Sequence, residues 1–176
     1  MGWFKQAQER QEDKVVSKIK NILQSHPFFQ QLMIDYQIPP EDINNHLRIV
    51  FADLENKFAE GNGEEIKISK KLLNDAFFKR NFHFVVHEFF HWIKRRSEAL
   101  FYFNDDEEIQ SFSLAIAWEI LSGNANTVEE TFYPIIAGHF ENRADAKQMF
   151  DSILSEAKKL VDTYKANQSN AQGIQL

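Results

Sequence analysis

Two histidines and a glutamate occur close together in the segment His87-Glu-Phe-Phe-His91, which has the pattern His-Glu-x-x-His. Residues four apart share one face of an α-helix, so the imidazoles of His87 and His91 can bind the same metal ion. Glu88 follows the first imidazole and can take a proton from a water molecule that the ion activates, then pass it to a leaving amine. The spacing therefore predicts a metal-dependent hydrolytic site on a helix.

The residues around this motif are largely apolar and aromatic, which favours a buried helix. Phe84 to Val86 precede the motif, and Trp92 and Ile93 follow it. A buried helix with ionisable residues at its centre needs compensating interactions, because burial of an unpaired charge is costly. A bound metal ion would supply them. The alternative is a helical protein without metal, in which the pattern is accidental and hydrogen bonds satisfy the same side chains.

A third ligand is expected in the acidic segment that starts at Asp105, because a catalytic zinc site normally has three protein ligands and an open position. We choose Glu108. Ser111 and Ala115 follow it at i+3 and i+7, and these small residues would let its helix lie close to the helix of the histidines.

Two other acidic residues of this segment are alternative ligands. Glu107 is the second candidate, since Ser111 at i+4 from it could hydrogen-bond a ligand histidine. Asp106 is the third. An acidic helix start is also favoured by the helix dipole without any metal, so part of this acidity needs no site to explain it.

The whole pattern resembles that of gluzincin zinc metallopeptidases, particularly the minimal forms and the ImmA/IrrE-like peptidases. In these families the His-Glu-x-x-His helix is followed by a short linker and a helix that supplies a glutamate ligand. His87, Glu88, His91 and Glu108 match those positions. The resemblance implies a zincin-like fold, Zn²⁺ as cofactor, Glu88 as the catalytic residue, and a peptide or protein substrate. It also implies an edge strand that aligns the substrate, to which Glu65–Ser69 is similar.

Apolar periodicity predicts an α+β fold that is mostly helical, with a small sheet before the motif helix. Helix-spaced apolar residues occur over residues 12–36, where Pro27 divides or kinks the helix. Residues 47–54 and 65–69 are typical of strands, either in a hairpin or as neighbours in one sheet, and residues 60–63 have turn chemistry.

The remaining segments are predicted to be helical up to the last ten residues. A helix is expected over about residues 72–97, with a break near Asn74. The helices expected after it run from Asp105 or Asp106 to about Leu121, from a capping box at Thr127 with a bend at Pro134, and over 142–165. Length predicts one domain over residues 1–166, and polar composition predicts a disordered tail over 167–176.

Charge and composition limit the partners and the ligand types. A formal net charge of −6 without a long basic run argues against nucleic acid or an anionic membrane as the main partner. The absence of cysteine excludes thiolate ligands, so a metal must be held by imidazole or carboxylate. No stretch approaches the roughly 20 apolar residues of a membrane span, and we expect a cytoplasmic protein. The oligomeric state is left open.

Other residues and other functions stay open at this point. His139, Tyr133 and Tyr102 are candidates for stabilising an oxyanion, without a spacing argument for any of them. His83 lies one turn before the motif and is interpreted as structural or as a support for the ligands. The second functional hypothesis is a catalytically silent, metal-binding regulatory protein on the same scaffold. Iron, manganese and nickel accept the same donors as zinc.

Overall fold

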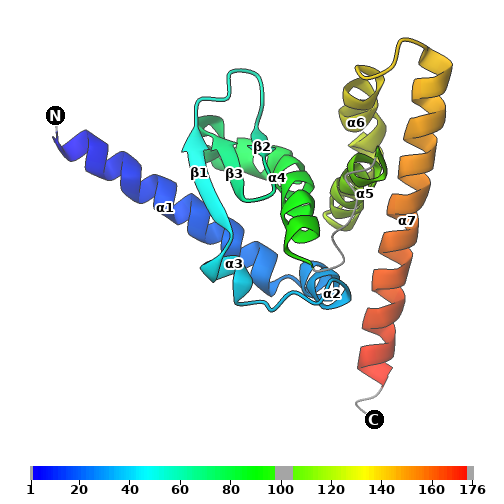
Figure 1. The fold of residues 1–176 in the computed structure, drawn as a ribbon, viewed down its shortest axis with the longest axis horizontal. Coiled ribbons are helices and arrows are strands. Elements are labelled where there is room, and N and C mark those ends of the chain that lie inside the picture. The colour runs from blue at the N-terminus through cyan, green and yellow to red at the C-terminus, as the bar shows by residue number, and fades with distance from the viewer. Residues whose placement is uncertain (1, 98–104, 174–176) are drawn as a thin grey trace. The chain divides into compact units, whose positions relative to one another are not determined.

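The computed structural model describes residues 2–97 and 105–173, which group into two compact units, Met1–Tyr102 and Phe103–Leu176 (Figure 1). The first unit contains α1 (Gly2–Ser25), α2 (Pro27–Asp35), α3 (Asp42–Asn45), β1 (Arg48–Ala52), β2 (Ala59–Gly61), β3 (Glu65–Ser69), the 3-10 helix η1 (Lys70–Leu73) and α4 (Asp75–Arg96). The second contains α5 (Asp105–Leu121), the 3-10 helix η2 (Ala125–Thr127), α6 (Val128–Ala137) and α7 (Arg143–Gly173). The predicted α+β, mostly helical fold with a small sheet before the motif helix is confirmed.

The sheet of the first unit has the strand order β1-β3-β2. β1 pairs with β3 in parallel, with Ile49 opposite Ile66. β2 pairs with β3 antiparallel, with Ala59 opposite Ile68. The two predicted strands are therefore neighbours in one sheet, and the hairpin alternative is wrong for them.

The edge of this sheet differs from the expectation drawn from the sequence. The segment Glu65–Ser69 is the central strand β3, so its assignment as an edge strand is wrong. The edges are β1 and β2, and the sequence predicts turn chemistry for part of β2. A strand of three residues is too short to display the alternation of apolar and polar residues on which strand prediction depends.

A side-chain cap defines the residue at which the motif helix α4 begins. Asn74 has an extended backbone, and its side chain accepts hydrogen bonds from the amides of Ala76 and Phe77 at 3.0 and 3.2 Å. Such a cap satisfies amides that have no partner inside the helix. The predicted break near Asn74 is therefore confirmed, and it separates η1 from α4.

One face of α4 forms much of the core of the first unit. Val85, Val86 and Phe89 are fully buried, and α4 packs on β2, β3 and η1. The Phe89 ring stacks on Trp92 and meets the edge of Phe29 from α2 at a centroid distance of 5.8 Å. Close packing of this kind restricts both the position and the rotation of the helix.

Pro27 begins α2, so the amino-terminal helical segment is divided as the sequence predicts. His26 caps α2, because its Nδ1 accepts a hydrogen bond from the Phe28 amide at 3.3 Å. Burial lowers the pKa of the His26 imidazole. The capping nitrogen must be unprotonated to accept this bond, so burial and capping favour the same neutral form.

The second unit is a group of helices whose core lies between α5, α6 and α7. Phe132 of α6, Phe150 of α7 and Ala115 of α5 are buried, and the Ser113 hydroxyl lies 3.3 Å from the Ile153 carbonyl oxygen on α7. α6 begins directly after Thr127, but the predicted capping box is wrong. The Thr127 hydroxyl instead donates to the carbonyl of Asn124 at 3.0 Å.

The last helix is longer than the sequence predicts. α7 continues to Gly173, whereas the apolar face ends near Tyr164, and residues 167–173 are helical rather than disordered. The prediction followed the apolar periodicity, but a helix can continue beyond its buried face when its residues have adequate helix propensity. The single domain over residues 1–166 stays a prediction beside the two compact units.

Within the part of the chain that the structure describes, no helix has both the length and the apolar character needed to cross a membrane.

Candidate metal centre

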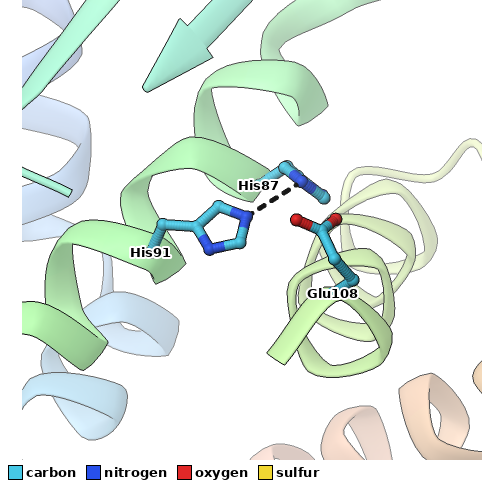
Figure 2. A group of neighbouring side chains, drawn as sticks. All are labelled: His87, His91 and Glu108. Carbon is cyan, nitrogen blue, oxygen red and sulfur yellow. Dashed lines mark hydrogen bonds between the residues drawn. The ribbon is translucent and has the colours of Figure 1, made fainter. Parts of the chain in front are cut away.

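Helix α4 places the two histidines of the motif side by side. Nε2 of His91 lies 3.2 Å from Nε2 of His87, and the ring centroids are 5.0 Å apart (Figure 2). Both side chains are half-buried, so the helix presents them at the boundary of the core. This is the juxtaposition that the i, i+4 spacing predicts.

The separation of these nitrogens fits a common metal ion. Zinc binds imidazole nitrogen at about 2.0–2.1 Å in tetrahedral geometry, which places two such ligands about 3.3 Å apart. The observed 3.2 Å agrees with this value without movement of the helix. Two neutral imidazoles that share one proton also fit this distance, so measurement of metal content must separate the two interpretations.

Glu88, which directly follows His87 in the motif, is half-buried and lies against the edge strand β2. A β-carbon built on Gly61 would stand 2.7 Å from Oε2 of Glu88. Only a residue without a side chain leaves room for the carboxylate in this position. Sequence patterns predict only a turn at Gly61, because this close approach joins residues 27 positions apart.

The proposed third ligand, Glu108, lies near the start of α5 in the second unit, and its side chain is exposed. Glu107 is half-buried. The Ser111 hydroxyl is buried and donates to the Glu107 backbone carbonyl at 2.9 Å. That proton is therefore used inside α5, which removes the reason given for Glu107. The side chain of Asp106 lies outside the described residues.

The structure also shows where most of the other candidate residues lie. His83 is buried, and its ring lies 4.3 Å from that of Phe84, in agreement with a structural role. Tyr133 packs edge-on against Phe150 within the second unit. His139 is exposed and lines a cavity of that unit together with Glu108. Tyr102 lies outside the described residues.

No protein-family model, no characterised protein and no solved structure matches this chain. We therefore infer the function from the residues of the site and from their geometry.

Proposed function

We propose that this protein is a zinc-dependent peptidase, with His87, His91 and Glu108 as metal ligands and Glu88 as the general base. The observation that carries the proposal is the 3.2 Å separation of the two Nε2 atoms on α4, which agrees with the spacing of two ligands on one tetrahedral ion. A glutamate directly after the first of these histidines is what hydrolytic chemistry on such an ion requires.

Glu108 is proposed as the third ligand because it completes a known kind of donor set. His87, His91 and Glu108 offer two imidazole nitrogens and a carboxylate oxygen, donors that together could hold a metal ion. Two histidines and one glutamate leave the fourth position of a zinc ion for water or substrate.

A zinc ion in this site would act as a Lewis acid and make hydroxide available near neutral pH. Glu88 follows His87 directly, and its carboxylate can accept the proton of the attacking water and return it to the amine of the departing peptide fragment. Gly61 leaves the space in which this carboxylate lies. The packed face of α4, with Val85, Val86 and Phe89, keeps the helix fixed while the proton moves.

The deciding experiment measures metal content in protein purified without an affinity tag or chelator. We expect near-stoichiometric zinc in the wild-type protein and loss of that zinc in His91→Ala. His46→Ala is the matched control, because His46 is exposed, directly follows α3 and lies beside Asp42. Protein that contains no metal and takes up none from added zinc would show that the two imidazoles share a proton instead.

A second measurement separates an enzyme from a silent metal-binding protein. Zinc-loaded protein is incubated with a mixed peptide pool, and the release of new amino termini is followed. Turnover that disappears with the zinc is the expected result. Bound zinc without any cleavage would favour the regulatory hypothesis over the peptidase.

A further inference from the structure

The second unit contains a partly open cavity of about 380 Å³ lined by residues of α5, of the α6 region and of α7. Its lining is predominantly apolar, and it includes the proposed ligand Glu108. All of its lining residues belong to one compact unit, so the cavity is a property of that unit. Ligand pockets range from about 300 to 1,000 Å³, which places this cavity at the size of a single bulky group.

The lining changes in character from the interior to the solvent. Ile136 and Ile153 are each 2% exposed and form an apolar floor. Phe112 and Met149 are half-buried and form the walls.

Glu108 and His139 are the exposed, polar residues of the lining, and they mark where the cavity meets solvent. The cavity thus has an apolar interior and a polar mouth.

We propose that this cavity binds a bulky apolar side chain of the peptide substrate, of the size of phenylalanine, leucine or methionine. The inference rests on the proposed function, because it takes Glu108 as a metal ligand. A group inside the cavity then lies beside the residue that holds the ion, so it belongs to a substrate residue next to the cleaved bond. Long and polar side chains are disfavoured, since the floor offers no hydrogen-bond partner that would compensate for their desolvation.

The two side chains that form the walls can accommodate apolar groups of several shapes. Phe112 gives a large flat apolar surface, and Met149 has an unbranched, flexible side chain that adapts to different occupants. His139 at the mouth can donate a hydrogen bond to the substrate backbone outside the cavity.

The test compares two metal-chelating probes on zinc-loaded protein of measured metal content. Acetohydroxamic acid carries only a methyl group, and 3-phenylpropanohydroxamic acid carries a phenyl group on a short chain. We expect the phenyl probe to bind at least about tenfold more tightly, because its ring leaves water for an apolar cavity. Dissociation constants come from calorimetric titration.

Variants connect this preference to the cavity. Met149→Trp fills the cavity from a half-buried wall and should abolish the preference for the phenyl probe while acetohydroxamic acid still binds. Phe112→Ala enlarges the cavity and should weaken the phenyl probe severalfold by removing contact surface. Tyr164→Trp is the control, since Tyr164 is half-buried on the same helix and does not line the cavity. Acetohydroxamate binding in each variant shows that the site is intact.

The outcomes separate the two proposals. Bound zinc, a phenyl preference and its loss in Met149→Trp support the cavity as a side-chain pocket. Bound zinc with equal affinity for both probes, or a preference that Met149→Trp and Phe112→Ala leave unchanged, overturns the pocket and leaves the metal centre standing. Protein that takes up no zinc overturns both.

Discussion

Gly61 lies so close to Glu88 that a β-carbon on the glycine would stand 2.7 Å from Oε2 of the carboxylate. The same β-carbon would stand 3.4 Å from Cβ of Glu88, which is ordinary contact. The nearest atom thus belongs to the far end of a flexible side chain. The edge strand β2 therefore sets the space available to the proposed general base.

Replacement of Gly61 by alanine is expected to displace the Glu88 carboxylate without unfolding the protein. Because His87 and His91 are untouched, zinc content should stay at the wild-type level, whereas turnover of the peptide pool should fall by up to about 10²-fold. Gly138→Ala is the matched control, since it adds the same methyl group in the other unit. Unchanged turnover in Gly61→Ala would mean that the position of this carboxylate does not matter.

Replacement of Glu88 by glutamine removes the proton acceptor and keeps the size of the side chain. We expect zinc binding to persist and the cleavage rate to fall by about 10²- to 10⁴-fold, the usual contribution of a general base. Glu60→Gln on the neighbouring strand β2 is the control. Full turnover in Glu88→Gln, with the control also active, would exclude the proposed mechanism.

Replacement of Glu108 by glutamine tests the third ligand. An amide oxygen is a poorer donor to zinc than a carboxylate, so zinc affinity should fall by more than about tenfold in competition with a chelating dye. Glu107→Gln, one residue earlier on α5, should retain wild-type affinity. The reverse pattern, with affinity lost in Glu107→Gln alone, would transfer the ligand role to Glu107.

Because His26 caps α2, we expect the free energy of unfolding to depend on pH. Burial lowers its pKa in the folded protein below the ordinary value of about 6.5, so the unfolded chain binds the proton more readily. The contribution of neutral His26 to the free energy of unfolding is complete above pH 6.5. It is lost as the pH falls through the lower pKa of the folded state. His26→Asn keeps an acceptor for the Phe28 amide and cannot titrate.

The measurement is urea unfolding of wild type and His26→Asn at pH 7.5 and pH 5.5. The wild-type protein should lose more stability between the two pH values than the variant does. The two proteins differ only at residue 26, so the difference isolates His26. Equal losses would show that the cap makes no contribution to the acid sensitivity.

The features that were predictable from the sequence depend on neighbours along the chain. Pro27 divides the amino-terminal helices because it lacks an amide hydrogen, and Asn74 caps the start of α4 because its side chain accepts from amides two and three residues later. The approach of His87 to His91 follows from 3.6 residues per helical turn. These interactions form within one or two helical turns, so they can be predicted from neighbouring residues in the sequence.

Other features required the folded chain, because they join residues that are distant in sequence. The parallel pairing of β1 with β3, the edge strand β2 and the close approach of Gly61 to Glu88 all bring separate segments of the chain together. The cavity beside Glu108 likewise needs side chains from α5, α7 and the α6 region. Periodicity shows which face of an element is apolar, but not which distant element covers it, and that choice follows from close packing of the core.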